Sequence, residues 1–227
     1  MNLRRDEIAS ALLAVKRRMS EALKISQRDP AEVILIAVTK TYPVSDVEIL
    51  RQLGIGDFAE NRDQEGRAKS AEVPGTWHFQ GQLQRNKIAS IAKWAKVVHS
   101  LDDARHLEMF ERVLPESSRI SVFIQVSLDP QPGRGGVLPE LIAPLAERVI
   151  RVPTLKLEGL MAVAPLGENP ESAFYRLALI HSDFRQQFPD SPYLSAGMSG
   201  DFESAIIHGA THLRVGSSIL GSRSHGR

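Results

Sequence analysis

Apolar residues recur with two different spacings along the chain. Near the N-terminus they occur at steps of three and four, with Arg and Glu between them, at Ile8, Leu12, Val15, Met19 and Leu23. This spacing predicts an amphipathic helix over residues 3–27. Asp29 and Pro30 should end it, because proline cannot continue a helix.

A second pattern follows and repeats to the end of the chain. Residues 33–38 (VILIAV) form a short continuous apolar run, typical of a strand covered on both faces in a parallel sheet. Seven further strand-like runs begin near residues 57, 77, 97, 120, 155, 193 and 212. Helical stretches are expected between them, at 44–53, 86–95, 102–113, 137–150, 171–187 and 201–208. This alternation predicts parallel strands joined by crossover helices.

Eight strand–helix units predict one closed barrel. The chain of 227 residues is slightly shorter than the ~250 typical of a (β/α)₈ TIM barrel. We therefore expect a single α/β barrel domain over residues 1–227, with an extra N-terminal helix. An open, doubly wound sheet is the structural alternative. The small, polar residues 222–227 are expected to form a disordered tail.

Composition and charge limit the possible functions. The formal net charge of +1 argues against nucleic acid or an anionic membrane as a partner. The absence of cysteine excludes disulfides and thiolate chemistry, and no histidine or carboxylate spacing suggests a metal site. No apolar run approaches the ~18 residues of a membrane span, and Asp6 and Glu7 interrupt any signal peptide. We expect a cytoplasmic protein.

The carboxyl ends of barrel strands are where functional groups gather, and Lys40 lies at one of them. It follows the first predicted strand by two residues. A crowded lysine there can become a nucleophilic amine and form a Schiff base with a carbonyl compound. A solvated loop lysine is the alternative interpretation.

Glycine-rich loops follow the last two predicted strands. Residues 197–202 (GMSGDF) come after the seventh strand and residues 216–221 (GSSILG) after the eighth, where this fold usually binds phosphate. Ser199 and Ser217 can add hydroxyl donors, and a following helix N-terminus favours an anion. The same loops could be tight turns with ordinary helix caps.

Three more polar residues lie at or near strand ends. Arg214 falls within the eighth strand, where a buried charge needs either a carboxylate such as Glu158 or Asp201, or a ligand atom. Asn61 closes the second strand and could donate to a ligand oxygen or cap a helix. His78, in the third strand, is more simply interpreted as a core residue with satisfied hydrogen bonds than as a catalyst.

Six stretches, in this order, resemble the pyridoxal phosphate homeostasis proteins (YggS/PROSC type). They are residues 37–41 (AVTKT), 59–65 (AENRDQE), 77–87 (WHFQGQLQRNK), 159–165 (GLMAVAP), 194–202 (LSAGMSGDF) and 214–217 (RVGS). The resemblance runs from about residue 5 to 223. It implies a fold related to the N-terminal barrel of alanine racemase and pyridoxal 5′-phosphate (PLP) as the cofactor.

The resemblance also implies the residues that hold PLP. Lys40 would bear it as a Schiff base, Arg214 would meet the pyridine nitrogen, and Asn61 would make a polar contact beside the ring. The phosphate would be held by the two glycine-rich loops, through Met198, Ser199, Gly200, Gly216 and Ser217. The chain departs from the family at Ala59 (usually Gly), Gln82 (usually His) and Arg134 (often Lys). An arginine cannot form an imine, so PLP transfer through position 134 is in doubt here.

These residues favour binding over catalysis. An arginine at the ring nitrogen stays protonated, which leaves that nitrogen unprotonated and the cofactor a weaker electron sink. A racemase also needs a second acid or base on the other face of its substrate, which related racemases take from an additional β domain. We expect a monomeric, non-catalytic protein that balances PLP and amino-acid pools, with PLP-dependent apoenzymes as candidate partners. A weak PLP-dependent amino-acid racemase is the first alternative, and a PLP-independent Schiff-base lyase acting on a phosphosugar is the second.

Overall fold

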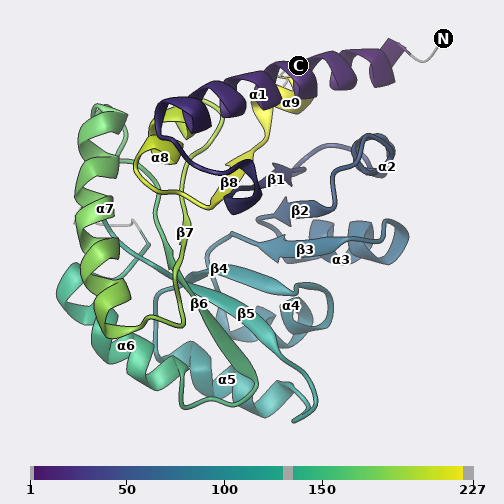
Figure 1. The fold of residues 1–227 in the computed structure, drawn as a ribbon. Coiled ribbons are helices and arrows are strands. Elements are labelled where there is room, and N and C mark those ends of the chain that lie inside the picture. The colour runs from purple at the N-terminus through teal and green to yellow at the C-terminus, as the bar shows by residue number, and fades with distance from the viewer. Residues whose placement is uncertain (1–2, 130–134, 222–227) are drawn as a thin grey trace.

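The computed structural model describes residues 3–129 and 135–221, and these form a closed barrel of eight parallel strands in chain order (Figure 1). Strand β1 pairs with β8 from Ile34 opposite His212 to Ala37 opposite Val215, which closes the barrel. The predicted TIM barrel is confirmed, and the open sheet is wrong because it would leave β1 and β8 unpaired. Arg134 and the predicted tail 222–227 lie outside the described residues.

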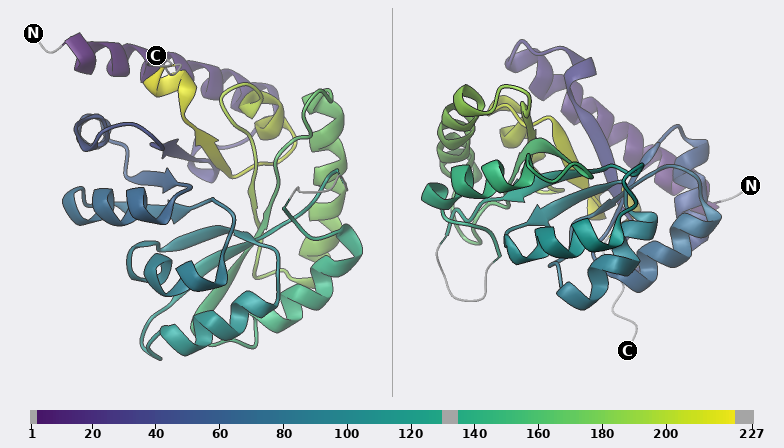
Figure 2. Two further views of the ribbon diagram at one scale, coloured as in Figure 1. Left: turned by 180° about the vertical axis from the view of Figure 1, so that it is seen from behind. Right: turned by 90° about the horizontal axis from the view of Figure 1, so that it is seen from below.

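The strands are all short, and the helices that connect them lie outside the barrel (Figure 2). The strands are β1 (Ile34–Val38), β2 (Asp57–Glu60), β3 (Thr76–Phe79), β4 (Val97–Leu101), β5 (Ile120–Gln125), β6 (Leu155–Met161), β7 (Tyr193–Ser195) and β8 (His212–Val215). The α-helices are α1 (Leu3–Ile25), α2 (Val44–Gln52), α3 (Asp63–Glu72), α4 (Ile88–Trp94), α5 (Arg105–Val113), α6 (Ile142–Val149), α7 (Pro170–Gln187), α8 (Phe202–Ile207) and α9 (Ser217–Leu220). Three 3₁₀ turns are η1 (Pro30–Glu32), η2 (Arg85–Lys87) and η3 (Pro139–Leu141).

The predicted helices are present, with shifts at their ends. The stretches predicted at 86–95 and 137–150 each begin as a 3₁₀ turn and continue as an α-helix, η2 to α4 and η3 to α6. Such tight first turns are common at helix starts. None of the helices in the described part of the chain has the length and apolarity needed to cross a bilayer.

The extra helix α1 lies across α8 and α9 (Figure 1). Its apolar stripe, including Ile8 and Leu12, is buried as the spacing predicted. At its start, the Arg4 guanidinium donates to Asp46 of α2 at 2.7 Å and to the Leu220 carbonyl of α9 at 2.9 Å. The helix therefore connects the first barrel unit with the last, on either side of the β1–β8 seam.

The main apolar core lies between the strands and the surrounding helices. Inside the barrel, the apolar cluster is small and consists of Ile36, Val38 and Ala59. Gly159 of β6 allows the tightest strand contact, because a Cβ there would lie 1.8 Å from the Tyr193 carbonyl oxygen and its φ is +155°. Much of the remaining interior is polar, which is unusual for a fold whose centre is commonly filled by branched apolar side chains.

Candidate functional site

A cavity of about 400 Å³ opens at the carboxyl ends of the strands, between the loop after β1 and the loops after β7 and β8. Seven of the eight predicted site residues line it: Lys40, Met198, Ser199, Gly200, Arg214, Gly216 and Ser217. The barrel therefore brings together residues that are up to 177 positions apart (217 − 40). A lysine, a buried arginine and two glycine-rich loops face one shared space.

Lys40 is half-buried in the turn that follows β1. Among the described residues its ammonium group has no hydrogen-bond or ion-pair partner, so its Nζ is available to a ligand in the cavity. The next residue, Thr41, has φ = +70°, a left-handed conformation that a β-branched residue rarely adopts. Such strain persists only where the surroundings impose it.

Side chains from β2 and α3 impose the backbone conformation around Lys40. Lys69 Nζ donates to the Thr39 carbonyl at 2.8 Å and to Glu60 Oε1 at 2.6 Å. Glu65 Oε2 accepts from the Thr41 amide at 2.7 Å and lies 3.3 Å from Lys69 Nζ. The peptide groups on both sides of Lys40 are thus held by one cluster of charged residues.

The pKa values of the two carboxyl groups in this cluster shift in opposite directions. Glu60 is fully buried, and burial raises the pKa of its carboxyl group, although hydrogen bonds from Lys69 and Thr39 act in the opposite direction. Glu65 is more exposed. Its partial burial is outweighed by the Thr41 amide and by Lys69, so its pKa is lowered.

The two glycine-rich loops are joined through Ser199. Its Oγ accepts from the Gly216 amide at 3.3 Å and from the Ser218 amide at 3.2 Å. These bonds are long for N–H···O contacts, so both amides could turn to a stronger acceptor such as a phosphate oxygen. Gly216 packs against β1, where an added Cβ would lie 3.0 Å from the Val38 carbonyl oxygen, while Gly200 has open space around it. The loops therefore form a small hollow bordered by backbone donors.

Arg214 is 3% exposed and forms part of the cavity wall. Its Nη1 donates to Ser195 Oγ at 2.5 Å and its Nη2 donates to the Ala162 carbonyl at 2.9 Å. Burial lowers the pKa of the guanidinium to about 10, with the charge of Asp201 opposing the shift. Arg214 consequently remains a cation at neutral pH.

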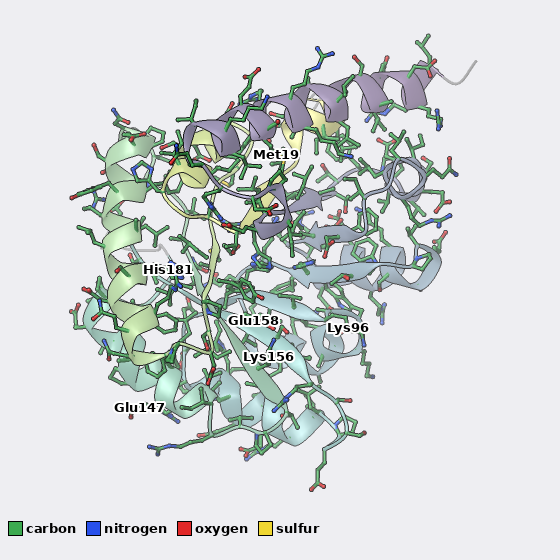
Figure 3. All side chains as sticks on the ribbon, viewed as in Figure 1. Met19, Lys96, Glu147, Lys156, Glu158 and His181 are labelled. Carbon is green, nitrogen blue, oxygen red and sulfur yellow. The ribbon has the colours of Figure 1, made fainter. Side chains whose placement is uncertain are left out.

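Neither carboxylate considered from the sequence as a partner for Arg214 bonds to it. Glu158 accepts from Ser121 at 2.6 Å and pairs with Lys156 at 2.9 Å; Figure 3 labels this pair on β6. Asp201 acts on Arg214 only through its charge. The other interpretation, in which Arg214 faces a ligand atom, fits its place in the cavity wall.

Asn61 differs from the other seven predicted site residues. It lies exposed at the end of β2 and is not among the residues that line the cavity; its carbonyl oxygen would be 2.1 Å from a Cβ added at Gly81. Sequence reasoning missed Gln80 and Tyr42, which do line it. The two-residue alternation along β3 could have identified Gln80. The Tyr42 hydroxyl donates to the Gly221 carbonyl at 2.5 Å across the edge of the cavity.

The sequence of this chain is similar to a family of known proteins. The alanine racemase N-terminal domain profile matches residues 12–224. A pyridoxal phosphate homeostasis protein from Corynebacterium glutamicum is 41% identical, over 91% of this chain and 97% of its own. One from Pseudomonas aeruginosa is 37% identical, over 96% and 97% of the two chains.

Solved structures are similar over the same span. PipY of Synechococcus elongatus with PLP bound has a TM-score of 0.81 and 32% identity, covering 94% of this chain and all (100%) of that one. Alanine racemase from Bacillus anthracis has a TM-score of 0.69 at 16% identity, covers 97% of this chain and 57% of that one, and shares the fold. From its fold, its profile match and its near-full-length relatives, this chain belongs to the pyridoxal phosphate homeostasis protein family.

Proposed function

We propose that this protein binds PLP in the cavity at the barrel mouth, as a Schiff base on Lys40, and so helps to balance intracellular PLP and amino-acid pools. The proposal is carried by one observation: a lysine with no partner among the described residues, a buried arginine and two loops with backbone donors line the same cavity. The amine of Lys40 would attack the aldehyde carbon of PLP and form a C=N bond, and water would leave.

The residues present fit the three chemically distinct parts of PLP. Lys40 suits the aldehyde. The side of the cavity lined by the loops that carry Ser199 and Gly216 suits the phosphate, because their backbone N–H groups favour an anion. Arg214 suits the pyridine nitrogen, because a guanidinium can only donate hydrogen bonds. Asn61 could contact the ring only from the rim, because it does not line the cavity.

Arg214 also bears on whether the site is catalytic. Bound PLP supplies an electron sink that stabilises a carbanion next to it, and protonation of its ring nitrogen strengthens that effect. A guanidinium beside that nitrogen offers a hydrogen bond without giving up its proton. The arrangement therefore supports holding the cofactor more than using it.

The racemase alternative needs an acid or base facing the substrate from the side opposite Lys40. Among the described lining residues, Tyr42 is the one side chain besides Lys40 and Arg214 with an acid–base group other than a serine hydroxyl. It comes from the same loop as Lys40, and its hydroxyl donates to Gly221. Exchange of the Cα proton of amino acids, followed in deuterated water, tests this alternative. Exchange at the rate of a metabolic enzyme would favour the racemase over the carrier.

Borohydride reduction of the PLP-loaded protein, followed by peptide mass mapping, tests the proposed bond. We expect a pyridoxyl adduct on Lys40 and loss of the imine absorbance in Lys40→Ala. Lys96→Ala is a matched control, since Lys96 is exposed and precedes β4, at the opposite end of the strands. An adduct on another lysine, or an unchanged spectrum of Lys40→Ala, would refute the assignment. The monomeric state, the cytoplasmic location and delivery to apoenzymes stay predictions.

A further inference from the structure

A continuous chain of polar side chains crosses the interior of the barrel beneath the cavity. It begins at Arg214 of β8, whose Nη1 is 2.5 Å from Ser195 Oγ of β7. Ser195 Oγ is 2.8 Å from His99 Nδ1 of β4, and His99 Nε2 is 2.8 Å from His78 Nδ1 of β3. His78 Nε2 is 3.1 Å from Asp57 Oδ1 at the start of β2. We call this the interior chain.

The two ends of the interior chain fix the direction of its first and last hydrogen bonds, and one arrangement then satisfies every link between them. A guanidinium has no acceptor and an ionised carboxylate has no donor, so Arg214 must donate and Asp57 must accept. The Ser195 hydroxyl then donates its hydrogen bond to His99 Nδ1, which must be unprotonated. His99 therefore carries its proton on Nε2 and donates to His78, which carries its own on Nε2 and donates to Asp57. Each link has one donor and one acceptor.

A reversed pattern is less well satisfied. If His99 donated from Nδ1 to Ser195, His78 would have to donate from both ring nitrogens and become a cation. The Ser195 hydroxyl hydrogen would then lack an acceptor, at a residue with 0% exposure. Leaving a buried donor unpaired costs more than the bond itself is worth. Burial, reinforced by the positive charge of Arg214, also holds the pKa of His99 well below its usual value, so this ring stays neutral.

Aromatic packing keeps His99 in this orientation. The Phe123 ring stacks on it at 4.7 Å between centroids, with only 6° between the planes. His212 meets the same ring edge-on at 6.4 Å, but its own Nδ1 lies 2.8 Å from Thr211, so it is not part of the interior chain. The ring cannot tilt without losing both contacts.

We propose that Asp57, His78, His99 and Ser195 are positioning residues, which hold Arg214 in one orientation at the cavity through a one-way series of hydrogen bonds. The proposal rests on the proposed function for its ligand, because Arg214 is expected to meet the ring nitrogen of PLP. Two guanidinium donors are used by Ser195 and the Ala162 carbonyl, and others remain for the cavity. Asp57, with 30% of its side chain exposed, supplies the negative charge at the far end.

The histidine tautomers test the interior chain without any cofactor. Long-range ¹H–¹⁵N NMR of the ligand-free protein with ¹⁵N-labelled histidine distinguishes protonated from unprotonated ring nitrogens. We expect His78 and His99 both to be neutral, each with its proton on Nε2, at pH 7. A cationic His78, or His99 protonated on Nδ1, would overturn the proposal even if PLP binding is normal.

The effect on Arg214 is tested by breaking the interior chain at a distance from the cavity. In His78→Phe, His99 loses its acceptor, and we expect PLP affinity to fall about tenfold with a shifted pH titration of the imine absorbance. The matched control is His181→Phe, which alters a buried histidine of α7 that takes no part in the interior chain; it should change affinity less than about twofold. Unchanged affinity and spectrum in a folded His78→Phe would refute the positioning role.

A second variant separates positioning from packing. Ser195→Ala removes only the hydroxyl that accepts from Arg214, and Ser195→Thr retains it. We expect the threonine to restore most of the affinity that the alanine loses; equal losses in both would contradict the proposal. If the unaltered protein binds no PLP, the proposed function fails, while the tautomer measurement still decides the interior chain.

Discussion

Replacing Lys69 by methionine should weaken both the fold and the attachment of PLP. Lys69 is 5% exposed and its ammonium group donates to Glu60, Glu65 and the Thr39 carbonyl. Methionine keeps most of the volume but removes the charge and all three hydrogen bonds. Glu60, with 0% exposure, is then left with the Thr39 hydroxyl as its remaining donor.

Breaking a buried ion pair from one side costs about 3–5 kcal/mol, because the remaining charge is buried without compensation. At about 2–4 °C per kcal/mol for a chain of this size, the melting temperature should fall by roughly 6–20 °C. The loss should depend on pH. A carboxyl group whose folded pKa is raised destabilises the fold as pH rises through that value, and protonation removes the penalty. Burial already raises the pKa of Glu60 above its ordinary 4.5, and losing Lys69 should raise it further.

Urea unfolding of Lys69→Met, measured between pH 4.5 and 8, checks this reasoning. The stability deficit should be small at the acid end and grow with pH. The double variant Glu60→Gln with Lys69→Met removes both charges and should recover much of the loss. Because the cluster also holds the peptide groups beside Lys40, the single variant should form the imine more weakly. A deficit in the free energy of unfolding below about 1 kcal/mol, or one independent of pH, would show that the Glu60–Lys69 pair contributes no more than a solvent-exposed ion pair.

Three further outcomes follow from the structure. Ser199→Ala should weaken inorganic phosphate and PLP binding about three- to tenfold in equilibrium titrations, since the hydroxyl accepts from the amides of Gly216 and Ser218 and so aligns them; full affinity would mean that these amides keep their positions without the hydroxyl. Gly159→Ala should reduce the soluble yield and the unfolding midpoint severely, because its Cβ would overlap a carbonyl oxygen of β7, and a stable variant would contradict the close approach. Burial lowers the pKa values of His181 and His212 to about 4, so both rings are neutral in the fold. Their contribution to stability should be full above pH 6.5 and should be lost as the pH drops toward 4. Replacing either histidine by phenylalanine should therefore flatten the decline in stability that acid unfolding curves record.

His181 illustrates the origin of this acid sensitivity. It lies on the face of α7 that is turned toward the strands (Figure 3) and is 7% exposed. Taking up a proton there would bury a charge, whereas the unfolded chain can protonate freely in water. Proton uptake on acidification therefore favours the unfolded state.

The barrel could be predicted from the sequence because each strand is covered on both faces. Burial on both faces makes runs such as residues 33–38 continuously apolar, and these alternate regularly with amphipathic segments. Helix α3 was harder to recognise. Its buried face consists largely of Gly66, packed against Trp94, and Lys69, which no apolar periodicity reveals.

Residues of the cavity could be predicted from the sequence only where a reactive or anion-binding residue follows or ends a predicted strand. Lys40, Arg214 and the two glycine-rich loops met that condition, and the fold brings the carboxyl ends together. Asn61 met it too, but it is exposed at the rim. The interior chain could not be predicted, because it depends on the register of five strands. The sequence around a histidine such as His78 does not show which side chains of other strands it contacts.

The β1–β8 seam has a consequence for synthesis on the ribosome. Lys40 is synthesised before the backbone donors that complete the cavity, which come from residues near 199 and 216. Until β8 is added, one edge of β1 is unpaired and the cavity lacks the loop after β8 that would bind an anion. A chain that lacks β8 would thus display the amine of Lys40 without the phosphate-facing loops, so retention of a ligand requires the β1–β8 pairing that closes the barrel.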